Sequence, residues 1–214
     1  MKTTNIDLTI EIRSENGSHT QFYEDHEDNI DKILSQLITP RLFTQPLLTL
    51  ASERSVSTVS CRTIDLIVAQ TPKPPSLLLP PGWLDIVEAG VEVFRGGALA
   101  NTADCADGEN FPTTAGITSY LEIHTIGDWM INLKLQTVVQ DNIWDEPQFL
   151  AHILDLPVIP FRTESGGVGF INPTKISRVT MHPAFSGVGL AGLPADLLRC
   201  VRQQNHHSSP MIRL

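Results

Sequence analysis

The segment Ile10-Glu11-Ile12-Arg13-Ser14 has a near copy later in the chain, Leu121-Glu122-Ile123-His124-Thr125. In both segments apolar and polar residues alternate, which is typical of a β-strand with one buried face. A second alternating segment follows each of them, at Thr20–Tyr23 and at Met130–Leu135. Asn16-Gly17 lies between the first pair, and this dipeptide favours a tight hairpin turn. The sequence therefore predicts a β-hairpin at the start of each of two similar units.

Further segments recur in the same order along the chain. With the pair above they make seven, at offsets between 110 and 116 residues: Asp28-Asn29-Ile30 with Asp141-Asn142-Ile143, Leu34–Leu37 with Leu150–Ile153, Pro46–Leu50 with Pro157–Phe161, Val56–Val59 with Val168–Ile171, Ile64–Ile67 with Ile176–Val179, and Gly82-Trp83 with Gly192-Leu193. Because their order is preserved, we predict a tandem duplication. The alternative is that two unrelated β-rich domains share common strand chemistry.

The duplication predicts where the units begin and end. We expect four parts: a first unit at 1–95, a flexible linker at 96–118, a second unit at 119–203 and a polar tail at 204–214. The linker is rich in Gly, Ala, Asn, Asp and Thr, which favour an irregular chain. Within the first unit, Pro72–Pro81 contains five prolines and predicts a stiff extended connection.

One principal helix is predicted in each unit. In the first, apolar residues at helical spacing follow an Asp28-Asn29 cap and stop before Pro40; they are Ile30, Ile33, Leu34, Leu37 and Ile38. In the second, the helix opens near Glu146-Pro147 and carries Phe149, Leu150, Ile153 and Leu154. Three more strands follow in each unit. The predicted fold class is α+β, with two mainly antiparallel units related by a pseudo-twofold axis.

Composition excludes several classes of function. The chain has 214 residues and a net charge of −9, and residues 1–111 carry −8 of it. Neither half is basic, so we expect no nucleic-acid partner. No apolar run approaches 18 residues, so we expect no membrane span, and with no secretory pattern at Met1 we expect a cytoplasmic protein. A chain of this length buries enough surface to need no cofactor for stability, and its three cysteines are expected to be reduced.

Three histidines form the candidate metal site. His124, His152 and His182 all belong to the second unit, and three imidazoles can bind zinc with a fourth position open. Their spacing fits no short ligand motif, so the alternative is three separate histidines that are exposed or hydrogen-bonded. Catalytic residues are not assigned by the sequence.

Other reactive groups have weaker support. Cys61 and Cys200 each follow or precede an arginine, but a cysteine nucleophile needs a lowered thiol pKa and a nearby base. The acidic residues around Cys105 do not have the order of a calcium-binding loop. We expect these cysteines to be small apolar side chains instead.

The function predicted from sequence is that of a non-catalytic binding or assembly module. We expect a protein partner or self-association as a homo-oligomer, and the β-prone region Val168–Met181 is the predicted interface, because it has few charges to protect a sheet edge. A small ligand is left open. The alternative function is a metal-dependent or hydrolytic enzyme, with its site in the second unit or in a cleft between the units.

Overall fold

The computed structural model describes residues 7–51, 56–104, 117–137 and 153–182. Residues 7–51 contain β1 (Leu8–Ser14), β2 (His19–Glu24), α1 (Glu27–Leu37) and β3 (Leu47–Ala51). Residues 56–104 contain β4 (Val56–Ser60), a 3₁₀ turn (Cys61–Thr63), β5 (Ile64–Gln70), β6 (Trp83–Glu88) and α2 (Val91–Asp104). The remaining segments contain β7 (Ile117–Thr125), β8 (Met130–Thr137), β9 (Ile159–Arg162), β10 (Val168–Ile171), a second 3₁₀ turn (Pro173–Lys175) and β11 (Ile176–His182).

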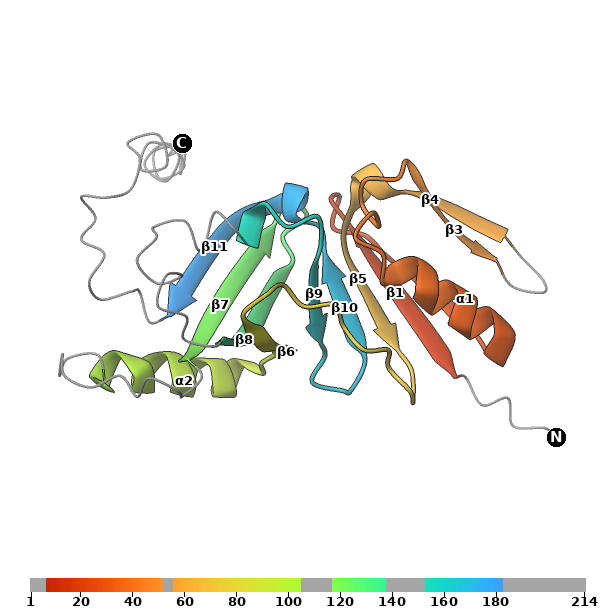
Figure 1. The fold of residues 1–214 in the computed structure, drawn as a ribbon. Coiled ribbons are helices and arrows are strands. Elements are labelled where there is room, and N and C mark those ends of the chain that lie inside the picture. Colours follow the sequence, from red (N-terminus) through yellow and green to blue (C-terminus); the bar gives the residue numbers. More distant parts are fainter. Residues whose placement is uncertain (1–6, 52–55, 105–116, 138–152, 183–214) are drawn as a thin grey trace, which may run out of the picture.

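Nine of these strands form one sheet, in the order β11-β7-β8-β6-β9-β10-β5-β1-β2 (Figure 1). Neighbours are antiparallel except β6 and β9, which are parallel. The two remaining strands, β3 and β4, form a separate antiparallel hairpin. The α+β class and the mainly antiparallel pairing are thus confirmed for the described residues.

The first core lies on one face of the sheet, at the β1–β2 end. Ile10 and Ile12 of β1 pack there with α1 and with Leu48 and Leu50 of β3. Strands β5 and β10 contribute Ala69 and Phe170 from their sides that face this core. Figure 1 shows α1 and the β3–β4 hairpin gathered at this end of the molecule.

The second core lies on the opposite face, toward the β7–β11 end. It contains Leu121 and Ile123 of β7, Leu133 of β8 and Ile86 of β6, all fully or almost fully buried. Side chains of β5 and β10 alternate between the two cores. Ala69 and Phe170 belong to the first core, and their neighbours Val68 and Ile171 belong to the second. The central strands are therefore covered on both faces. At the β7–β11 end, a small third cluster of Ala89, Phe94 and Tyr120 packs α2 against the face opposite the second core.

Most predicted elements are confirmed. Both opening hairpins form, and three strands follow in each half. The predicted core residues Ile30, Leu34, Leu37 and Ile153 are buried. Phe149, Leu150 and the start of the second predicted helix lie outside the described residues. The proline-rich connection has no regular secondary structure, and its Leu77 and Leu79 pack against the first and second cores respectively.

The predicted cap of the first helix is wrong. His26, not Asp28 or Asn29, is the N-cap residue of α1, and its side chain makes no capping bond. The nearby hydrogen-bond acceptor is Glu24, which is buried at the end of β2. Its Oε1 accepts from the backbone N–H groups of Asp25 and His26, and its Oε2 accepts from the Asn29 side chain. Helix α1 thus begins two or three residues closer to β2 than the sequence predicts.

The predicted linker at 96–118 also needs correction. Residues 96–104 belong to α2, and 105–116 lie outside the described residues. Gly97 explains the difference, because a Cβ atom there would overlap the Tyr120 ring of β7. This glycine permits a helix to lie close to the sheet, where Phe94 packs edge-on against Tyr120 at 5.9 Å between ring centroids. At Gly97, the glycine reflects close packing and not an irregular chain.

The two halves of the described chain contact each other at the β7–β8 turn. Gly127 donates its backbone N–H to Oδ2 of the fully buried Asp65 on β5, at 2.7 Å. Trp129 donates its indole N–H to the Ser14 carbonyl, and its ring lies 5.2 Å from the Arg13 guanidinium. Within the described residues, neither helix is long and apolar enough to cross a membrane.

Candidate functional site

The structure places two of the three predicted metal-binding histidines on adjacent strands. His124 pairs with Arg178 and His182 pairs with Tyr120, so the two imidazoles lie four residues apart along the β7–β11 ladder. Four residues along a strand correspond to about 13 Å between Cα positions. The described residues contain no group of three His, Cys, Asp or Glu side chains able to hold a metal. His152 lies outside them, so the three-histidine site stays a prediction.

His124 belongs instead to a polar cluster with Glu122 and Arg178. Its Nε2 lies 2.7 Å from Glu122 Oε1, and Arg178 reaches the same oxygen at 2.9 Å. The hydrogen bond with His124 lowers the pKa of Glu122, and the charges of His124 and Arg178 act in the same direction against the opposing effect of burial. On β1, Glu11 and Arg13 form an ion pair at the same spacing, also at 2.7 Å. Such i, i+2 pairs on one strand face are a structural feature of both halves.

Cys61 is fully buried in the first core. Burial raises the pKa of its thiol, which disfavours the thiolate that nucleophilic chemistry requires. Cys61 is therefore a small apolar core residue, as expected. Cys105 and Cys200 lie outside the described residues.

The sheet ends in two strands that each have one partner among the described residues. β11 pairs with β7, and β2 pairs with β1. Along β2, His19, Thr20, Gln21 and Tyr23 are exposed. On β11, Ser177 and Arg178 are exposed. Unpaired strand edges present rows of backbone donors and acceptors, which pair readily with another strand.

The predicted interface at Val168–Met181 divides between two environments. Its first part, β10, lies between β9 and β5 and is buried. Its second part, β11, is an edge. The alternating pattern predicted strands in both places, but an uncharged strand is equally suited to the centre of a sheet, and only the pairing partners distinguish the two positions.

A groove between β2 and β3 is the feature that sequence reasoning missed. It has a volume of about 220 Å³, and its lining includes Leu8, Phe22, Tyr23, Glu24, Leu50 and Ala51. These residues come from β1, β2 and β3, which are separate in the sequence, so no short sequence motif predicts the groove. Comparisons with models of protein families, with curated proteins and with solved structures give no match to this chain.

Proposed function

We propose that this chain is an assembly module made of two similar units, and that it associates with further copies through the open edges of its sheet. The observation that carries the proposal is that the nine-stranded sheet ends, within the described residues, in one unpaired edge at β11 and another at β2. Neither edge strand carries the dense charge or proline that blunts edges in monomeric sheet proteins.

A shared order of elements supports two similar units. In the first half, β1, β2, α1, β3, β4, a 3₁₀ turn and β5 follow one another. In the second half, β7, β8, β9, β10, a 3₁₀ turn and β11 follow in the same order, and the interval between β8 and β9 corresponds to α1. In each half the first strand lies between the second and the last.

Pairing registers supply independent support. Ile12 pairs with Ile67 in the first half, and Ile123 pairs with Val179 in the second. Ile12 and Ile123 are 111 residues apart in the chain, and Ile67 and Val179 are 112 apart. Both ladders also have an irregularity in their pairing register near one end, between Arg13 and Ser14 in the first and between Ile176 and Arg178 in the second. Independent domains have no reason to share an irregularity at the same place.

The hairpins agree as well. Leu48 pairs with Val59 in β3–β4, and Ile159 pairs with Ile171 in β9–β10, again at shifts of 111 and 112. In the opening hairpins, the left-handed residues are Gly17, with φ of 76°, and Asp128, with φ of 63°, which are 111 residues apart. Similar units that pair edge to edge within one chain can pair in the same way between chains.

Sedimentation velocity over a range of concentrations tests the proposal. We expect the full chain to self-associate, and we expect Thr180→Lys on the β11 edge to raise the dissociation constant at least about tenfold, because a lysine on an edge strand opposes further pairing. The matched control is Gln136→Lys on β8, which already has a partner on each side. A chain that remains monomeric at every concentration would contradict the proposal.

A further inference from the structure

The groove between β2 and β3 has a filled counterpart in the second half. There, β6 lies between β8 and β9, antiparallel to the first and parallel to the second. Val87 of β6 is the residue that pairs with both, with Lys134 on one side and Arg162 on the other. The residues 111 positions earlier in the chain, which correspond to Lys134 and Arg162 in the first half, are Tyr23 and Ala51. Both of them line the groove.

We propose that this groove is an acceptor site for one β-strand, and that the strand comes from residues 183–214 of a second copy of the chain. This inference rests on the proposed function and names the segment that carries out the assembly. The incoming strand runs antiparallel to β2 and parallel to β3, as β6 does between β8 and β9. Strand addition of this kind supplies main-chain hydrogen bonds along two edges at once.

The origin of β6 identifies the donor. β6 follows β5 through the connection that contains the five prolines, and it enters the sheet three strands away from β5. The counterpart of β5 is β11, and the chain continues after it for the 32 residues 183–214. The segment that follows β11 therefore corresponds to the segment that fills the groove in the second half.

Distance favours a second copy over the same chain. β11 and β2 are the two ends of the nine-stranded sheet. Eight strand spacings separate them, about 38 Å, whereas the three spacings from β5 to β6 span about 14 Å. If a second copy places its β4 against β11, as β10 lies against β5, then the groove of that copy is again about three spacings, or 14 Å, away. Assembly by this rule continues head to tail, with one groove filled at each junction.

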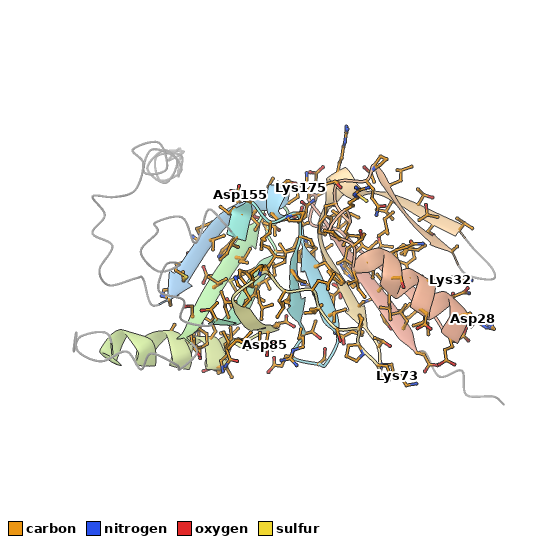
Figure 2. The ribbon with its side chains drawn as sticks, viewed as in Figure 1. Asp28, Lys32, Lys73, Asp85, Asp155 and Lys175 are labelled. Atoms are coloured by element: carbon orange, nitrogen blue, oxygen red, sulfur yellow. The ribbon has the colours of Figure 1, made fainter. Side chains whose placement is uncertain are left out.

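Charge is complementary between the groove and its proposed occupant. Asp25, Glu27 and Asp28 are exposed where β2 leads into α1, and Figure 2 shows Asp28 at the outer end of the molecule. Residues 183–214 contain three arginines and one aspartate, so their net charge is +2 in a chain whose net charge is −9. A basic segment is attracted to these acidic residues, which follow the lining residue Glu24 directly in the chain.

The chemistry of the groove suits an apolar, alternating strand. Phe22 and Leu50 provide apolar surface at its base, and Leu50 is 5 % exposed. The buried carboxylate of Glu24 already accepts three hydrogen bonds from the chain around α1, so the occupant need not supply a cation there. Ile86 of β6 is fully buried in the equivalent strand, which shows how inward positions are filled when the slot is occupied.

Hydrogen exchange on the full chain locates the site. On going from dilute to concentrated protein, we expect amides of β2 and β3 to exchange at least about tenfold more slowly, because they gain partners in the assembly. Amides of β7, which already has two neighbours, serve as the internal control. Self-association without added protection at β2 and β3 would overturn the acceptor site while leaving the proposed function intact.

A competing peptide tests the occupant. A synthetic peptide of residues 183–214, added in excess to the full chain, is expected to occupy the groove, protect β2 and β3, and shift the sedimenting species toward the monomer. A peptide of the same composition in scrambled order is the control. If the assembly forms and the native-sequence peptide neither binds nor dissociates it, then residues 183–214 are not the donor and the inference fails.

A pair of substitutions on β3 separates the groove from the rest of the strand. Ala51 lines the groove and is exposed, so Ala51→Trp should obstruct it without loss of the fold and weaken association at least about tenfold. Leu47→Trp is the matched control, since Leu47 lies on the same strand, is 54 % exposed and is not part of the lining. Equal effects of the two substitutions would contradict the proposal.

Discussion

At the scale of single residues, Glu122 makes the stability of the folded chain depend on pH. Its lowered pKa means that the ionised form is favoured in the folded chain by its hydrogen bond with His124. The resulting stabilisation is fully present above the ordinary glutamate pKa of about 4.3, and it is lost as the pH falls through the lower pKa of the folded state.

Glu122→Gln therefore has a pH-dependent cost. We expect the variant to be less stable than the parent chain at pH 7, and we expect the difference to shrink as the solution is acidified below about pH 4. Urea denaturation at a series of pH values measures it. Glu164→Gln, at an exposed position, is the control. A difference that stays constant with pH would show that ionised Glu122 contributes nothing to folding.

Glu24 illustrates what sequence reasoning misses at this scale. Asp28-Asn29 has the residue types of a cap, but the carboxylate that orders the start of the helix is Glu24 of the preceding strand, which accepts from the backbone N–H groups of Asp25 and His26 just before α1. The position of Glu24 relative to the helix depends on the angle between β2 and α1, and local helix propensities do not predict that angle. The polar cluster of Glu122, His124 and Arg178 is similar, because Arg178 joins it only through the β7–β11 register.

At the scale of elements, the apolar spacing predicted α1 and its buried face correctly. Leu34 is 7 % exposed and belongs to the first core. Leu34→Ala should lower the free energy of unfolding by about 2–5 kcal/mol, because a buried leucine leaves a cavity when truncated. Chemical denaturation followed by circular dichroism checks this. The exposed Ser35→Ala, one residue further along, should change stability by less than about 0.5 kcal/mol.

The two opening hairpins offer a paired prediction. Gly17 has φ of 76°, so Gly17→Ala should cost about 1–2 kcal/mol, because a Cβ atom is disfavoured in the left-handed region. Asp128, with φ of 63°, already bears this strain, so Asp128→Gly should not destabilise the chain through its backbone. Thermal denaturation of both variants measures the effects. No loss of stability in Gly17→Ala, together with a clear loss in Asp128→Gly, would contradict the shared turn geometry.

The strands of the two units and α1 were predictable because strand alternation and helical spacing are local, whereas α2 and β6 were not predicted. The position of each strand in the sheet was not predictable. β6 and β10 have ordinary strand sequences, yet β6 lies among strands of the second half, and β10 pairs with β5 of the first half. These pairings depend on contacts between distant segments, and the sequence of either strand alone does not contain its partner.

At the scale of the whole molecule, close backbone contact joins the two halves. A Cβ atom at Gly127 would overlap the Ser14 carbonyl and lie 2.8 Å from Asp65 Oδ2. Gly127→Ala should therefore destabilise the chain by about 1–3 kcal/mol through strain at this junction. Gly96→Ala is the control, because no atom lies within 4 Å of a Cβ there and alanine favours the helix by about 1 kcal/mol. Urea denaturation measures the free energy of unfolding of both variants. An unchanged free energy of unfolding in Gly127→Ala would show that the backbone at the junction moves to accommodate the added Cβ atom.

The pairing of β5 with β10 also has a consequence during synthesis. β5 ends at Gln70, and β10 begins at Val168. A ribosome that adds about 5–20 residues per second needs about 5–20 s to make the intervening chain. Throughout that interval, the edge of β5 that pairs with β10 in the folded chain has no β10 to pair with. Neighbouring ribosomes on one message would present the same edge to each other, so translation speed and spacing influence how much of the newly made protein pairs correctly.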